Sequence, residues 1–221
     1  MNTGTQCATS VTLLLGGAPA GDRKGQIIAA AYRLLEEGGL EELTIRAVLK
    51  RTGLARRAFY ESFAGKDDLV VAVFERTLLG LSEYYEARAS EIGDPIETIR
   101  AIIQGIFLGR YEITDDPGDF TDRLSAALSR EHLRLAEARP AELHAALKPL
   151  LGLIAEQVRR GIRTGQCREC DPDLQAKLIY NLVATTAHTE LLAEEVGGPD
   201  VERRRKLAGQ VWDFCHRAIR A

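Results

Sequence analysis

One stretch of the chain, residues 44–69, restricts the fold more than any other. Its sequence, TIRAVLKRTGLARRAFYESFAGKDDL, contains two short amphipathic segments separated by Thr52-Gly53-Leu54. Thr44 is a good helix N-cap, because its hydroxyl can accept a backbone N–H, and Gly53 is free to adopt the left-handed conformation that ends a helix. Two helices joined by a short turn that contains Gly predict a helix-turn-helix, whose second helix enters the major groove of DNA.

The second of these segments separates an apolar side from a polar side. Phe59 and Phe63 lie four residues apart and share one face of a helix, whereas Arg56, Arg57 and Tyr60 project elsewhere. Arginine donates to phosphates or bidentately to guanine, and tyrosine reaches a phosphate or a thymine methyl. We therefore predict that the two arginines and the tyrosine contact DNA. The alternative is a solvated arginine pair on an ordinary helix surface.

Glu61 is an unusual residue for a surface that meets DNA. It follows Arg57 by four residues, so the two side chains can form an ion pair on the helix. A carboxylate can also accept a hydrogen bond from cytosine N4. Both roles remain open from the sequence, as does a role as a brake on non-specific DNA binding.

The charge of the chain is divided unevenly. The whole chain carries −3, but residues 23–66 contain nine Lys or Arg against five Glu, which gives this segment +4 and leaves −7 for the remainder. A basic head on an acidic body is typical of a protein that neutralises DNA phosphates with one end only.

Helical periodicity continues to the end of the chain, and no alternating valine-rich segment competes with it. We predict an all-α protein with a three-helix helix-turn-helix domain at 23–68 and a larger helical domain at 69–221. Residues 1–22, rich in Thr, Gly and Ala, are expected to form a mobile tail. The expected helices outside the helix-turn-helix cover 24–37, 66–92, 95–113, 119–138, 141–164, 172–195 and 200–221.

Several of these residues together resemble the TetR family of bacterial transcription regulators. The resemblance covers residues 25–74 and rests on Thr44, Gly53-Leu54, Phe59-Tyr60, Phe63 and Lys66-Asp67-Asp68-Leu69. It implies a DNA-binding N-terminal domain and a C-terminal ligand-binding and dimerisation domain. It also implies phosphate contacts at Thr44 and Lys66, which lie at helix N-termini where backbone N–H groups favour anions; Arg46 is a further phosphate candidate.

Ala55 departs from the family pattern, in which Ser or Thr is usual at this N-cap. The recognition helix is therefore expected to lack about 1 kcal/mol of capping free energy.

The last two segments, 172–195 and 200–221, carry apolar faces that can either complete a monomer core or pair with a second copy. The resemblance favours the homodimer. The interface residues that we expect are Tyr180, Val183, Ala184, Ala187, Leu191, Leu207, Val211, Phe214 and Ala218.

Cavities between bundled helices combine apolar walls with a few polar groups. On that basis we expect an apolar or aromatic small-molecule effector, with simple core packing as the alternative role of its candidate contacts. These are Phe107, Tyr111, Phe120, Leu147, Leu151, Tyr180 and His188.

Cys167 and Cys170 form a C-x-x-C pair beside Arg168, which suggests an alternative, thiol-based trigger because positive neighbours lower thiol pKa values. No second cysteine pair, histidine spacing or nucleophile motif indicates a metal site, a cofactor or catalysis.

The sequence thus predicts a cytoplasmic, ligand-responsive DNA-binding regulator that its effector releases from a near-palindromic operator. Repression is the expected mode of regulation, and the sequence leaves activation open as the alternative. A second alternative is an all-α enzyme or scaffold whose helix-turn-helix serves only protein contacts.

Overall fold

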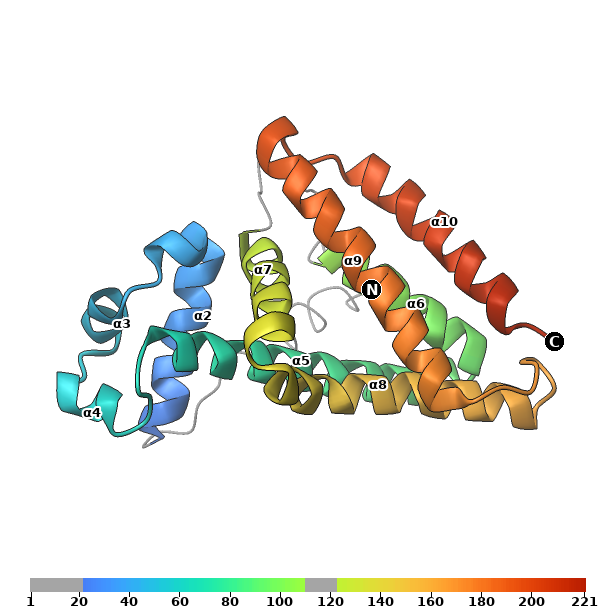
Figure 1. Cartoon of the computed structure of the whole chain (residues 1–221), viewed down its shortest axis with the longest axis horizontal. Coiled ribbons are helices and arrows are strands. Elements are labelled where there is room, and N and C mark those ends of the chain that lie inside the picture. The colour runs from blue at the N-terminus through green and yellow to red at the C-terminus, as the bar shows by residue number, and fades with distance from the viewer. Residues whose placement is uncertain (1–21, 110–122) are drawn as a thin grey trace, which may run out of the picture. The chain divides into compact units, whose positions relative to one another are not determined.

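The computed structural model describes residues 22–109 and 123–221, and apart from one isolated bridge between Cys167 and Arg220 the regular structure in these ranges is helical (Figure 1). This confirms the predicted all-α class. Within the described ranges, no helix has an apolar stretch long enough to cross a membrane. The helices are α2 (Arg23–Glu42), α3 (Ile45–Thr52), α4 (Arg56–Tyr60), α5 (Lys66–Ile92), α6 (Pro95–Leu108), α7 (Arg123–Ala138), α8 (Pro140–Arg163), α9 (Pro172–Gly197) and α10 (Val201–Ile219).

Aspartates cap several helices, but two helix ends differ from those expected, one of them in α6, which ends at Leu108, before Gly109 with a φ of 51°, and not at residue 113. Asp94, Asp171 and Asp200 accept backbone N–H groups at the starts of α6, α9 and α10. The helix predicted to end at Gly38-Gly39 is interrupted there, because Gly39 takes a positive φ of 68°, but helical structure resumes beyond this kink and reaches Glu42. Residues 1–21 and 110–122, which include most of the predicted tail and the adjoining ends of the helices expected at 95–113 and 119–138, lie outside the described ranges.

The chain forms two compact units, and the long helices α5 and α8 contribute to both. The described residues of the first unit are 22–80 and 123–146, and those of the second are 81–109 and 147–221. The first unit therefore contains α7 in addition to the predicted helix-turn-helix.

The core of the first unit holds α3 and α4 in place. Phe59 of α4 is fully buried, and Phe63 packs against its ring with centroids 5.6 Å apart. Leu124 and Ala127 of α7 enter the same core, which explains why α7 joins this unit. The remaining buried members come from α2, α3 and α5, and include Ile27, Leu35, Val48, Leu69 and Val73.

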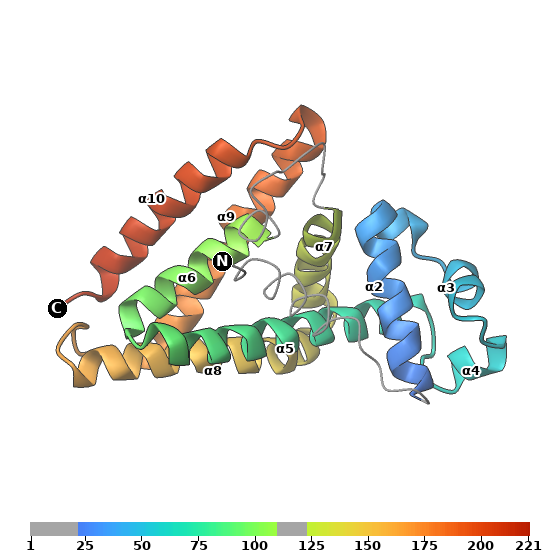
Figure 2. The same ribbon diagram turned by 180° about the vertical axis from the view of Figure 1, so that it is seen from behind.

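In the second unit, α6 packs against both α9 and α10 (Figure 2). Ile99, Ile102 and Ile103 of α6 are almost completely buried, as the apolar arc of this segment predicts. Arg204 of α10 and Glu194 of α9 form a buried ion pair, in which the guanidinium donates through Nε and Nη2 to both carboxylate oxygens. This pair connects the end of α9 to the start of α10.

Candidate nucleic-acid interface

The turn between α3 and α4 has the geometry that its sequence predicts. Thr44 caps α3, because its Oγ1 accepts the N–H of Ala47 at 3.1 Å. Gly53 adopts the left-handed conformation with φ of 69°, and its N–H donates to the carbonyl of Leu49 at 2.9 Å. The chain therefore reverses direction within a few residues and enters α4.

α4 presents its polar side chains to solvent and its apolar ones to the core. Ala58 and Phe59 are buried, whereas Arg56, Arg57 and Tyr60 are exposed. Ala55 makes no side-chain cap bond, so the missing cap expected at this helix start is confirmed. The three predicted DNA contacts thus project together from one short helix.

Arg56 and Tyr60 restrain one another. The Arg56 guanidinium lies 5.5 Å from the centroid of the tyrosine ring, and its Nη2 donates to the hydroxyl at 3.3 Å. A cation above an aromatic face is held by the ring quadrupole. The pair presents one positive charge and one hydroxyl to solvent in a limited set of conformations.

Arg57 and Glu61 form the intrahelical ion pair that their spacing allows. Arg57 Nε donates to Glu61 Oε1 at 3.0 Å, and Arg23 of α2 lies 3.9 Å from the other oxygen. Both partners of the Arg57 pair are well exposed, with side-chain accessibilities of 90% and 50%, so the pair contributes little to stability. The pair engages only Nε of Arg57, so the Nη groups can still donate to a phosphate or a base, but the neighbouring Glu61 carboxylate opposes the approach of a phosphate.

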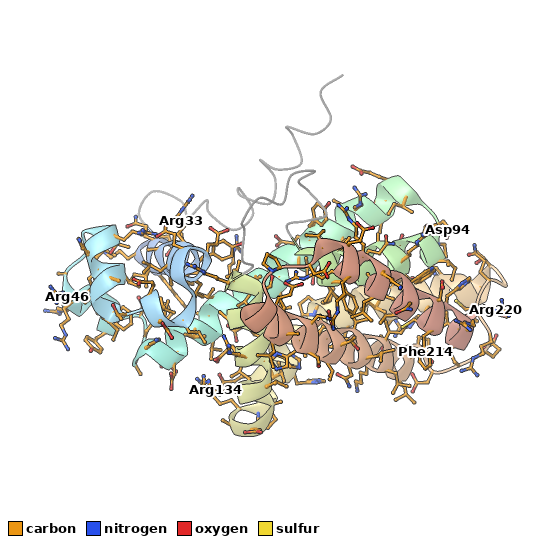
Figure 3. All side chains as sticks on the ribbon, turned by 90° about the horizontal axis from the view of Figure 1, so that it is seen from above. Arg33, Arg46, Asp94, Arg134, Phe214 and Arg220 are labelled. Carbon is orange, nitrogen blue, oxygen red and sulfur yellow. The ribbon has the colours of Figure 1, made fainter. Side chains whose placement is uncertain are left out.

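The residues predicted to contact phosphates differ in solvent exposure and in the hydrogen bonds that they already make. Thr44 and Arg46 are exposed, and Arg46 points away from the helices into solvent (Figure 3). Lys66 is half-buried, and its Nζ donates to the carbonyl of Leu40 at 2.9 Å. Lys66 therefore ties the start of α5 to the end of α2, a role that the sequence did not indicate.

Further contacts that the sequence did not reveal fix the end of α2. Arg51 of α3 holds Glu37 through two hydrogen bonds of 2.8 and 2.7 Å, which lower the pKa of the Glu37 carboxyl, and Arg123 of α7 donates to the Glu37 carbonyl. At a different place, the start of α5, Asp68 accepts the N–H of Ala64 and also pairs with Arg139 at 3.1 Å. The two partners of Glu37 are 14 and 86 residues away along the chain, so local sequence patterns carry no signal for them.

The predicted effector contacts are only partly described. Tyr111 and Phe120 lie outside the described residues. Phe107, Leu147 and Tyr180 are buried in the second unit, while Leu151 and His188 are half-buried. Burial raises the pKa of the Tyr180 hydroxyl. A separate open groove of about 780 Å³ between α5 and α8 contains none of the candidates; Glu86, Ser90, Lys148, Leu153 and Arg160 are among its lining residues.

Cys167, the first cysteine of the C-x-x-C pair, is buried. Burial, together with nearby Cys170 and Asp94, raises the pKa of the Cys167 thiol. The neighbouring Arg168 donates through Nε to the carbonyl of Ala218 at 2.7 Å. For Cys167 this raised pKa is the opposite of the lowered thiol pKa on which the thiol-based alternative depends. In the described ranges, no cluster of three or more His, Cys, Asp or Glu residues is arranged to hold a metal.

The expected dimer residues fall into two groups. Tyr180, Val183, Ala187, Leu191 and Val211 are buried within the single chain. The others are at least partly accessible: Ala184, Leu207 and Ala218 are half-buried, and Phe214 is 64% exposed on α10 (Figure 3).

Comparisons with known proteins agree with this arrangement. The model of the family described as bacterial regulatory proteins, tetR family, matches residues 27–73. The HTH-type transcriptional repressor KstR2 of Mycobacterium tuberculosis is 22% identical over 188 residues, covering 80% of this chain and 84% of the repressor. The HTH-type transcriptional regulator BetI 1 of Chromohalobacter salexigens is 34% identical over 86 residues, covering 38% of this chain and 43% of the regulator.

Two solved structures have the same fold. The transcriptional regulator FadR from Bacillus subtilis, in complex with stearoyl-CoA, aligns with a TM-score of 0.66 at 21% identity and covers 86% of this chain and 96% of its own. The complex of SmeT with triclosan aligns with a TM-score of 0.61 at 25% identity and covers 90% of this chain and 92% of its own; SmeT is the repressor of a multidrug efflux pump of Stenotrophomonas maltophilia.

Proposed function

The chain belongs to the tetR family of bacterial regulatory proteins, and from this premise we propose that it is a ligand-responsive transcriptional repressor that binds a near-palindromic operator as a homodimer. The observation that carries the proposal is the exposed side of α4, where Arg56, Arg57 and Tyr60 project from a helix anchored by the buried Phe59. Such a protein acts where the bacterial chromosome lies, in the cytoplasm.

The effector is proposed to be a small molecule with an apolar or aromatic part. The FadR and SmeT structures carry stearoyl-CoA and triclosan, which both have such a part. In one conformation of the proposed dimer the two helix-turn-helix domains match the spacing of the half-sites, and in the other they do not. A ligand that binds the second conformation more tightly lowers operator affinity, to an extent set by the ratio of its affinities for the two conformations. The apolar interior of the second unit, with Phe107, Tyr180 and His188, is the proposed location.

The proposed dimer surface is the side of α9 and α10 that the chain itself leaves exposed. Leu174 and Leu178 of α9 are 53% and 55% exposed, Leu192 is 40% exposed, and Phe214 of α10 is 64% exposed. The α9 residues recur at helical spacing along one face. A second copy that places the same two helices opposite would bury these side chains in a bundle.

Replacing Arg57 by Ala is expected to weaken operator binding by about 1–3 kcal/mol, which is the usual contribution of one guanidinium that donates to a base. Fluorescence anisotropy with an operator fragment measures the change. Arg100→Ala, which removes an exposed arginine of α6, is the matched control and should bind as the wild type does.

Lys66→Ala is expected to make the slope of log operator affinity against log salt concentration shallower, by the amount that corresponds to about one phosphate contact. Anisotropy titrations of the operator at several salt concentrations measure this slope. If Arg57→Ala and Lys66→Ala both bind DNA as tightly as the wild type, the helix-turn-helix serves protein contacts, as the enzyme or scaffold alternative requires.

Glu61→Gln is expected to tighten binding to random-sequence DNA, since it frees Arg57 from its ion pair and removes a negative charge from the interface. The slope of log affinity against log salt should steepen by about 0.9, the value for one more phosphate contact. Titrations of random and operator duplexes at several salt concentrations measure both quantities. Glu91→Gln, at an exposed position of α5, is the control. If the two variants have the same affinity for random DNA and the same salt slope, Glu61 has no role in DNA selection.

A further inference from the structure

Arginines of this chain repeatedly bind carboxylates through one edge of the guanidinium, the edge formed by Nε and an Nη. In Arg134, for example, Nε and Nη2 donate to the two oxygens of Glu131 at 2.9 and 2.6 Å. Parallel N–H groups of this kind match the two oxygens of a carboxylate. The same side-on pairing joins Arg139 to Glu142, Arg203 to Glu190 and Arg204 to Glu194.

Arg88, in the part of α5 that belongs to the second unit, differs from these arginines. Its side chain is half-buried, and its Nε is buried without a hydrogen-bond acceptor. No other buried side-chain nitrogen or oxygen in the described part of the chain lacks a partner. A buried donor without an acceptor is costly, so it requires an explanation beyond the stability of the fold.

The residues one or two helical turns before Arg88 on α5 include apolar and aromatic side chains, and the exposed Glu91 follows Arg88 by three residues. Tyr85 is 2% exposed, and its ring meets that of Tyr84 edge-on with centroids 5.0 Å apart. Tyr84 and Leu81 lie four and seven residues before Arg88, and Ile92 lies four residues after it; all three are half-buried on the same side of the helix. A half-buried arginine beside half-buried apolar side chains suits a ligand that has an apolar body and a single negative group.

We propose that Arg88 anchors the negatively charged group of the effector, and that the effector is an amphipathic carboxylate. Its two oxygens accept the Nε and Nη hydrogens side-on, as the glutamates do elsewhere in the chain, and its apolar part contacts the side of α5 that carries Leu81 and Tyr84. A carboxylate fits better than a phosphate dianion, because a half-buried site desolvates one charge at a lower cost than two. The assignment of the ligand as the effector rests on the proposed function.

The first test is the stability of the ligand-free protein. Arg88→Met removes the unpaired donor and keeps the apolar contacts of the side-chain stem, so it is expected to maintain or raise the melting temperature. Arg100→Met in α6, which breaks only an exposed ion pair with Glu97, is the control. A melting temperature of Arg88→Met clearly below both the wild type and the control would make Arg88 a structural residue and overturn the proposal.

The second test is calorimetric binding of matched acids and neutral amides to the full chain. Decanoate and 4-phenylbutyrate are expected to bind about ten- to a hundredfold more tightly than decanamide and 4-phenylbutanamide, the range for charge-assisted hydrogen bonds. Arg88→Met should abolish this preference, while Arg88→Lys should retain part of it, because an ammonium keeps the charge but not the planar edge. Arg100→Met should behave as the wild type does.

Several outcomes would overturn the proposal. These are equal binding of acid and amide by the wild type, failure of both acids to bind, and a preference that survives Arg88→Met. Displacement of the acids by acetate or inorganic phosphate at equal concentration would mean an unselective anion contact and would exclude an amphipathic ligand.

Operator affinity, measured in parallel with the acids present, separates this proposal from the proposed function. Acids that bind through Arg88 but leave operator affinity unchanged would support the anchor and contradict the effector role. A wild-type protein that binds no operator would contradict the proposed function, while the calorimetric comparison would still decide the role of Arg88.

Discussion

Replacing Phe214 by Glu is expected to convert the proposed homodimer into a monomer and to abolish operator binding at concentrations that saturate the wild type. Phe214 is the most exposed of the large apolar side chains of the described residues, at 64%, and it lies on α10, which packs against α9. A charge at the centre of an apolar interface leaves two like charges without water or counter-ions. The two DNA-binding domains are then on separate molecules. Binding of one domain to its half-site therefore no longer gives the other domain a high effective concentration at the second half-site.

Sedimentation velocity and anisotropy with the operator measure the two effects on the same sample. Leu133→Glu is the control, because Leu133 is 43% exposed on α7, in the other unit. A Phe214→Glu protein that remains dimeric would place the interface elsewhere. A monomer that binds the operator with wild-type affinity would contradict the two-headed mode of binding.

Replacing Arg204 by Ala is expected to lower the free energy of unfolding by about 3–5 kcal/mol, because it leaves the Glu194 carboxylate buried without its partner. Both side chains of the pair are less than 10% exposed. Arg204 also directs Nη1 toward the carbonyl of Phe107 at 3.5 Å, so the substitution removes a contact to the end of α6 as well.

Urea unfolding at a fixed protein concentration measures this decrease. Arg159→Ala breaks an exposed pair with Asp173 and is expected to cost no more than about 1 kcal/mol. The double replacement of Arg204 and Glu194 by Met should restore most of the stability, since neither charge remains buried. Equal decreases in Arg204→Ala and Arg159→Ala would show that the buried pair contributes no more than a surface one.

The helix-turn-helix could be predicted from sequence because local chemistry specifies it. Thr44 caps a helix whatever the tertiary context, Gly53 tolerates a positive φ, and the four-residue spacing of Phe59 and Phe63 defines a buried face. Each of these signals spans only a few residues. The structure realises all of them, and α4 begins without a side-chain cap as Ala55 indicates.

The contacts between distant segments could not be predicted in this way. An amphipathic pattern shows which face of a helix is buried but does not name its partner, so the sequence did not assign α7 to the first unit. The same limitation applies to the dimer surface. Val183 and Leu191 belong to an apolar face that the single chain buries, whereas Leu174 and Leu178 lie on an exposed side of α9. In the sequence, Arg88 cannot be told from other helical arginines. Only the structure shows that its buried Nε has no hydrogen-bond acceptor among the described residues.

Footprinting of the purified full-length protein on genomic DNA fragments tests the proposed function most directly. We predict protection of a discrete, near-palindromic site whose half-sites lie about one helical turn, ~34 Å, apart, and loss of that protection in Arg57→Ala at a protein concentration that just saturates the wild-type site. Uniform protection along the DNA, a site without two-fold symmetry, or an unchanged footprint in Arg57→Ala would contradict it.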